Sequence, residues 1–134
     1  MLLDFHVMHN RYKMNVTGVI HIGGHTGQEY DIYKDYDSIK DMIFFEPDPD
    51  TFELMKNNID LGPFSCTTNF NREKNNEGQS NSILNPKIHL EQYPNIVFTD
   101  KIDIQVHPLD KYEPGPTLNM INIDVQGFEL MVFL

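Results

Sequence analysis

The stretch GVIHIGGHTGQE, residues 18–29, constrains the fold of this chain more than any other feature. Its short apolar run is rich in β-branched residues and ends in two glycines, as a buried strand does. The polar residues after Gly27 are typical of a helix start, and Thr26 with Glu29 predicts a capping box. The glycines between strand and helix serve either a tight turn or the close approach of a ligand to the backbone.

Strand and helix patterns continue to alternate along the chain. The run DMIFFEP, residues 41–47, predicts a second strand, and Asp48 with Pro49 predicts the N-cap and first position of the next helix. Residues 71–82 are polar and predict a loop. Shorter strands are expected at 61–70, 96–99 and 101–106, and a last strand at 118–125 is followed by an apolar segment typical of a helix. This alternation predicts an α/β fold with a mostly parallel sheet.

Length and charge narrow the classes of protein that the chain can belong to. Its 134 residues predict a single domain, with 1–16 as an N-terminal extension and 17–134 as the α/β core. A formal charge of −10 argues against a nucleic acid or an anionic membrane as partner. The single cysteine, Cys66, and the absence of a signal-peptide pattern at the start indicate a cytoplasmic protein.

Three predicted strands end in polar or glycine residues, namely Gly23-Gly24, Glu46 and Asp124. Ligands of parallel α/β sheets bind beyond the carboxyl ends of the strands, so we expect these ends to converge. Glu46 is suited to accept the hydroxyls of a ribose. The dinucleotide fingerprint is broken by Ile22, which stands where glycine is required, so a nicotinamide oxidoreductase is disfavoured. An adenosine-containing ligand without phosphate, such as S-adenosylmethionine, fits better.

Five segments carry a resemblance to a known family. In order they are GVIHIGGHTGQE, FFEPDPDTFELMKNNI, NEGQSNSIL, VHPLDKY and INIDVQGFEL. Together they resemble the landmarks of FkbM-type S-adenosylmethionine-dependent methyltransferases over about residues 17–134. The resemblance implies a class I, Rossmann-like methyltransferase sheet and O-methylation of a hydroxyl on a sugar or small metabolite. It also implies a sheet that is incomplete after the fourth main strand, because the family continues with further strands beyond the position of Leu134.

The resemblance also implies roles for particular residues. Asp124 would position or deprotonate the acceptor hydroxyl, with Glu129 as a second catalytic candidate and with Gln126 and Gly127 completing the same motif. No metal site is expected, and His21 stands where the family often has an acid. The implied cofactor-binding residues are Gly23, Gly24, His25, Gly27, Glu46, Pro47, Asp48, Ser82 and Asp124, with Ser80 in the same serine-containing loop as Ser82.

Simpler interpretations remain open beside these roles. The glycines could serve only a turn, Glu46 could interact only with a helix dipole, and Asp124 could cap the final helix. The chain could also be a catalytically incomplete S-adenosylmethionine-binding module that acts with a partner. If the strand at 118–125 lies at a sheet edge, we expect a homodimer or a partner chain to cover it. A branched side chain at Gly23 is expected to block the ligand while the fold still forms.

Overall fold

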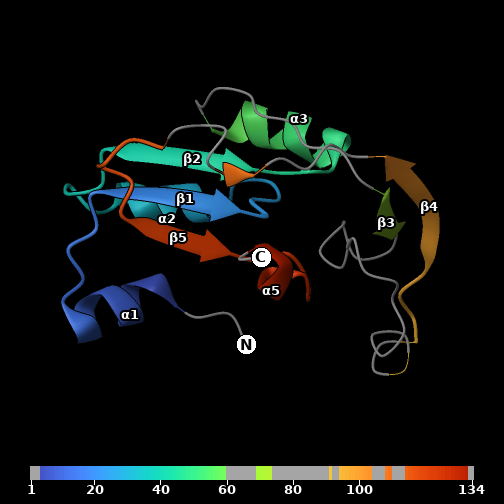
Figure 1. The fold of residues 1–134 in the computed structure, drawn as a ribbon, viewed down its shortest axis with the longest axis horizontal. Helices are drawn as coiled ribbons and strands as arrows, with labels where there is room; N and C mark the ends of the chain where they lie inside the picture. Colours follow the sequence, from blue (N-terminus) through green and yellow to red (C-terminus); the bar gives the residue numbers. More distant parts are fainter. Residues whose placement is uncertain are drawn as a thin grey trace.

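The computed structural model describes residues 4–59, 69–73, 91, 94–103, 108–109 and 114–132. Figure 1 shows the arrangement of the helices and strands. In chain order these are α1 (Phe5–Tyr12), β1 (Gly18–Ile22), α2 (Glu29–Lys34), β2 (Asp41–Phe45), α3 (Pro49–Asn58), β3 (Asn69–Glu73), β4 (Phe98–Asp103), β5 (Met120–Ile123) and α5 (Glu129–Val132).

The main sheet has three parallel strands in the order β2-β1-β5. The central strand β1 is the most buried of the three, and its Val19 is fully buried. Val19 pairs with Met42 of β2 on one side and with Met120 of β5 on the other. Such burial is expected of a parallel strand with neighbours on both sides. The predicted α/β fold with a mostly parallel, Rossmann-like and incomplete sheet is therefore confirmed.

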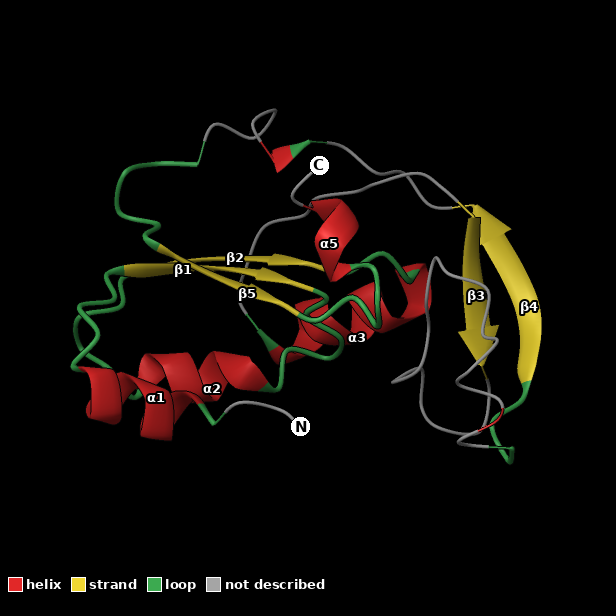
Figure 2. Cartoon of the chain, turned by 60° about the horizontal axis from the view of Figure 1, so that its bottom comes forward, coloured by secondary structure: helices red, strands yellow, loops and turns green. Residues whose placement is uncertain are grey.

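The first three helices lie on one face of this sheet, as Figure 2 shows, whereas α5 lies toward the other face. Tyr33 of α2, Phe44 of β2 and Met55 of α3 are all buried in one cluster. The cluster consists of Val16, Val19, Tyr33, Ile39, Phe44, Met55 and Ile59. The hydrophobic core therefore sits between the sheet and its helical layer, beneath the ends of the strands.

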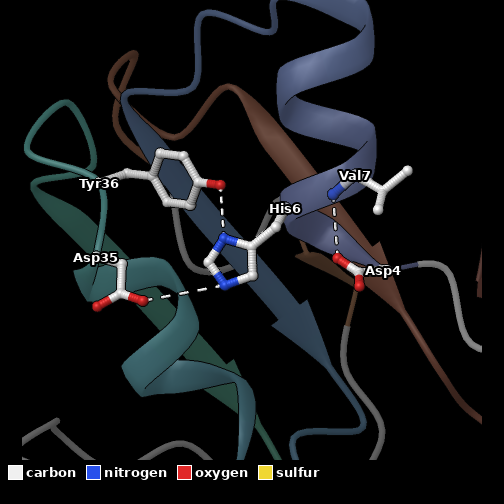
Figure 3. A network of polar contacts seen from close by, with 5 residues as sticks. All are labelled: Asp4, His6, Val7, Asp35 and Tyr36. Atoms are coloured by element: carbon white, nitrogen blue, oxygen red, sulfur yellow. Dashed lines mark hydrogen bonds and ion pairs between the residues drawn. The ribbon is translucent and has the colours of Figure 1, made fainter.

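The expected N-terminal extension contains α1, which packs against α2. The carboxylate of Asp4 caps α1 by accepting a hydrogen bond from Val7 N at 3.0 Å. Figure 3 shows the side chain of His6, whose Nδ1 lies 2.7 Å from the Tyr36 hydroxyl and whose Nε2 lies 3.9 Å from Asp35. The extension therefore contributes to the helical layer. The single-domain division of the chain stays a prediction.

Strands β3 and β4 differ from the sequence prediction. They form a separate antiparallel pair, with Asn69 opposite Asp103, and do not join the main sheet in the described part of the chain. The strands predicted at 96–99 and 101–106 are one strand over 98–103, and the predicted loop at 71–82 begins inside β3. The physical reason is polarity: β4 is mostly exposed, which an antiparallel pair tolerates and a parallel sheet does not. Residues 61–68 lie outside the described residues.

The predicted capping box at Thr26 is wrong. Helix α2 begins at Glu29 with Gln28 at its N-cap and without a side-chain cap. A turn closed by the bond from Gly27 N to Gly24 O, at 2.8 Å, precedes the helix and delays its start. The carbonyl of Thr26 instead accepts a hydrogen bond from Asn58 Nδ2 at 2.9 Å, which ties this turn to the end of α3.

Gly23 permits a close contact between the ends of β1 and β5. Its φ is +87°, and a Cβ built there would lie 1.8 Å from the carbonyl oxygen of Asp124. A side chain at this position would therefore collide with the backbone of the neighbouring strand. The expectation that a branched residue at Gly23 would leave the fold largely formed is corrected by this contact.

We predict that Gly23→Val lowers the free energy of unfolding by more than about 2 kcal/mol, because left-handed strain and a backbone clash add. Gly115→Ala is the matched control, since a Cβ there meets only Thr117 Oγ1, at 3.8 Å. Its effect should stay within about 0.5 kcal/mol. Urea unfolding followed by circular dichroism measures both variants. Equal midpoints for Gly23→Val and the unmodified protein would contradict the prediction.

Candidate functional site

The three predicted strand ends meet at one edge of the sheet. Ile22, the last residue of β1, pairs with Phe45 of β2 and with Ile123 of β5. The next residue along each strand is Gly23, Glu46 or Asp124, so all three follow the same row of the sheet. The predicted convergence at the carboxyl edge is therefore confirmed, and this edge is the candidate functional site.

Packing also restricts two further positions of the loop to glycine. A Cβ at Gly24 would lie 2.8 Å from Cδ1 of Phe44, and one at Gly27 would lie 2.9 Å from Cγ2 of Ile59. Gly27 also has a φ of +80°, and His25 has a φ of 46°. The loop is therefore a tight turn held against the core and α3. This conformation fixes the loop backbone beside the candidate site.

The backbone N–H groups of the loop are already engaged within the protein. Gly23 N and Gly24 N both donate to Phe45 O at 2.9 Å, and Gly27 N donates to Gly24 O. His25 N donates to Oε2 of Glu46 at 2.8 Å. A phosphate-binding loop works by presenting such N–H groups to the ligand. These four donors point instead to protein acceptors, so this loop is poorly suited to hold a phosphate.

Glu46 joins the glycine loop to the start of α3. One carboxylate oxygen accepts from His25 N, and the other accepts from Asp48 N at 2.9 Å, across Pro47. Burial raises the pKa of Glu46 to about 7, although both backbone hydrogen bonds oppose the shift. Nearby Asp48 adds to the increase. The site therefore contains a carboxyl group that titrates near neutral pH.

Asp48 has a well-defined local role. Its side chain is 1% exposed and caps α3 by accepting from Asp50 N at 3.0 Å and Thr51 N at 3.2 Å. The predicted N-cap, with Pro49 at the first helical position, is therefore confirmed. The implied contact of Asp48 with adenosine stays a prediction.

The turn after β5 holds the two catalytic candidates. Oδ1 of Asp124 accepts from Gln126 Nε2 at 2.8 Å, and Gln126 and Gly127 both have positive φ. Glu129 Oε1 accepts from Val125 N at 3.2 Å and from Gly127 N at 3.0 Å. Burial raises the pKa of Glu129, but its backbone hydrogen bonds outweigh this and lower it overall. Glu129 is thus better suited to hold the turn than to accept a proton, which leaves Asp124 as the stronger candidate.

Sequence reasoning missed two features of this edge. Glu29 was assigned only to a helix cap, yet it is half-buried within the electrostatic influence of Asp124 and His25. His21 is buried among aromatic rings and stacks on Phe44, with the two ring centroids 5.1 Å apart. Glu29 lies four residues before Tyr33, so the two share one face of α2. That spacing was the signal that could have placed Glu29 beside the strand ends.

Several predictions concern residues beyond those described. Ser80, Ser82 and Cys66 all lie outside the described residues. Across the described ranges, no group of three or more His, Cys, Asp or Glu side chains is arranged to hold a metal ion. None of the helices in those ranges combines the length and apolar character needed to cross a bilayer.

A parallel sheet with a glycine loop, an acidic second strand end and an acidic final strand end is the arrangement of Rossmann-like methyltransferases. Residues 21–134 match the family model of the methyltransferase FkbM domain. The chain therefore belongs to the FkbM methyltransferase family. No curated protein and no solved structure matches it significantly.

We predict that the carboxyl carbon of Glu46 titrates with a midpoint near pH 7 in NMR spectra, with the signal assigned by its loss in Glu46→Gln. Because folding raises this pKa above the usual value of 4.5, the contribution of the group to stability is fully present below pH 4.5. That contribution is lost as the pH rises to about 7. The unmodified protein should therefore lose stability over this range relative to Glu46→Gln. A midpoint near 4.5 would contradict the burial that the structure shows.

Proposed function

We propose that this protein transfers a methyl group from S-adenosylmethionine to a hydroxyl on a sugar or small metabolite. The observation that carries the proposal is the Glu46 carboxylate at the carboxyl edge, next to a glycine loop whose N–H groups are engaged. Family membership supports the methyl transfer. The engaged loop favours a nucleoside ligand without phosphate over a dinucleotide.

The residues at this edge fit an adenosine ligand. A carboxylate has about four acceptor sites, and the two backbone bonds of Glu46 use two of them. The others can accept the two hydroxyls of a ribose when the group is ionised. Because the pKa of unliganded Glu46 is about 7, hydroxyl donors would favour ionisation and release a proton near neutral pH. We therefore expect affinity to rise as the pH increases through 7.

For methyl transfer, the side chains need only align the acceptor hydroxyl with the methyl group and remove one proton. S-adenosylmethionine supplies an activated methyl group on a sulfonium. The chain must hold the acceptor oxygen in line with it and take the hydroxyl proton. Asp124 is the candidate for this proton because Glu129 is engaged by the turn. Gln126, which donates to Asp124, would orient that carboxylate.

A binding module without turnover is the alternative. The described sheet contains only three parallel strands, and family membership does not itself require activity. Turnover assays with S-adenosylmethionine and a panel of sugar hydroxyl acceptors separate the two. A cytoplasmic location stays a prediction, supported by the single cysteine.

We predict that S-adenosylmethionine and S-adenosylhomocysteine raise the melting temperature of the protein and that NAD does not. Ligands that bind only the folded state stabilise it in proportion to the logarithm of their concentration. Differential scanning fluorimetry at several ligand concentrations measures the effect. Stabilisation by NAD alone would replace the proposed function with a nicotinamide-dependent one.

Glu46→Ala is the matched variant for this measurement. Losing the ribose contact should weaken binding of S-adenosylhomocysteine by about 1–3 kcal/mol, the range for a lost hydrogen bond to a charged group or for an unpaired polar partner. Glu53→Ala, on the exposed side of α3, should leave the affinity unchanged. Equal affinities for Glu46→Ala and the unmodified protein would show that the ribose lies elsewhere.

We further propose that a second copy of the chain covers β5. This strand lies at one edge of the described sheet, as the sequence predicts. Ile121 on β5 is 46% exposed and Leu130 on α5 is 71% exposed, so the strand and the helix that follows it each expose an apolar side chain. Exposed strand edges with apolar side chains favour pairing with another chain.

Light scattering should therefore give the mass of a dimer at micromolar concentrations. Leu130→Ser should shift the protein toward the monomer because it removes apolar area from the proposed contact. Leu54→Ser, at an exposed leucine on α3, is the control and should leave the dimer intact. A monomer at all concentrations would reject the proposed contact.

A further inference from the structure

Three polar side chains form a buried layer beneath the candidate site. His21 of β1 and Asn122 of β5 are register partners, and Tyr33 reaches them from α2. The Tyr33 hydroxyl accepts from Asn122 Nδ2 at 2.8 Å and lies 3.1 Å from His21 Nδ1. Burial lowers the pKa of His21 to about 4, so its ring is neutral and Nδ1 can accept the hydroxyl proton. We call this the buried triad, and it fixes α2 relative to both strands.

The side chains next to the buried triad, toward the carboxyl edge, follow from the two-residue period of a strand and the four-residue spacing of a helix face. Two residues beyond His21 and Asn122 lie Gly23 and Asp124, on the same side of their strands. One helical turn before Tyr33 lies Glu29, on the same face of α2. Glu29 and Asp124 therefore stand above the buried triad at the edge of the sheet. Gly23, which follows β1 in the same row as Asp124, has no side chain.

The charge of Asp124 acts on the carboxyl group of Glu29. Burial raises the pKa of Glu29, and the negative charge of Asp124 raises it further, against the opposing effects of a backbone hydrogen bond and His25. Two carboxylates that repel across a partly buried space are stabilised by a cation placed between them. Methyl donors of the S-adenosyl type carry such a cation at the α-ammonium of their methionine end.

We propose that Glu29 binds the α-ammonium group of the methyl donor, and that the nearby negative charge of Asp124 adds to the attraction. The inference rests on the proposed function and assigns a residue that the proposed chemistry does not use. On β1, His21 belongs to the buried triad and points into the core, so it is not available to a ligand at the edge. The negative charge for the ammonium is therefore supplied from α2, and the triad acts by positioning Glu29 opposite Asp124.

The test compares ligands that differ only at the methionine end. Glu29→Gln should weaken S-adenosylhomocysteine about tenfold to a hundredfold, the range for a lost hydrogen bond to a charged group. Binding of 5′-methylthioadenosine, which lacks the amino-acid end, should change less than about twofold. S-adenosylmethionine and its decarboxylated form, which keeps the ammonium, should lose affinity equally. Isothermal titration calorimetry measures each dissociation constant.

Asp31→Asn is the matched control, because it removes a charge from an exposed position of the same helix, and it should leave all four affinities unchanged. Asp124→Asn should repeat the selective loss and provides the test if Glu29→Gln does not fold. Equal losses for S-adenosylhomocysteine and 5′-methylthioadenosine, no loss for either, or tighter binding of S-adenosylmethionine would each overturn the inference. Failure of the unmodified protein to bind any of the four ligands contradicts the proposed function itself.

Discussion

The pairing of β1 with both of its neighbours is the constraint on which the rest of the structure depends. Because Ile22 is level with Phe45 and Ile123, a single row of the sheet sets the positions of the three residues that follow. The contact of Gly23 with the backbone of Asp124 maintains this row where the strands separate. A one-residue slip of either neighbour would turn its buried side chains outward and move its strand end out of the site.

Burial raises the pKa of one carboxyl group at each side of this row. At β2, Glu46 is buried deeply enough for its pKa to rise, yet it is held by two backbone N–H groups that favour its ionised form. Beside β5, the pKa of Glu29 is raised by burial and by the charge of Asp124. Carboxyl groups with raised pKa values that gather at a strand edge are typical of functional sites. The proposed ligand would bring hydroxyl donors to Glu46 and a cation to Glu29, and so would favour the ionised form of both groups.

The elements around β1, β2 and β5 could be predicted because their sequences are locally consistent. Apolar runs bounded by glycine or proline leave little choice of secondary structure, and the capping of α3 follows directly from Asp48 and Pro49. The start of α2 could not be predicted in the same way. The turn from Gly24 to Gly27 depends on packing against Ile59, which lies far along the chain. The pairing of β3 with β4 was missed for a similar reason, because the sequence of a polar strand does not indicate which strand it pairs with.

The candidate site was predictable in outline, whereas its electrostatics required the fold. The order of strand ends placed Gly23, Glu46 and Asp124 at one edge, but no local pattern shows that His21 points into the core. That direction follows from the alternation of β1 once Val19 faces the helical layer, because His21 lies two residues further along the same face. A histidine on this face must be neutral and hydrogen-bonded to be tolerated, and Tyr33 with Asn122 meets that requirement. The neutral histidine on β1 is therefore coupled to α2 and β5, so replacing His21 alone with aspartate would bury a charge beside Tyr33.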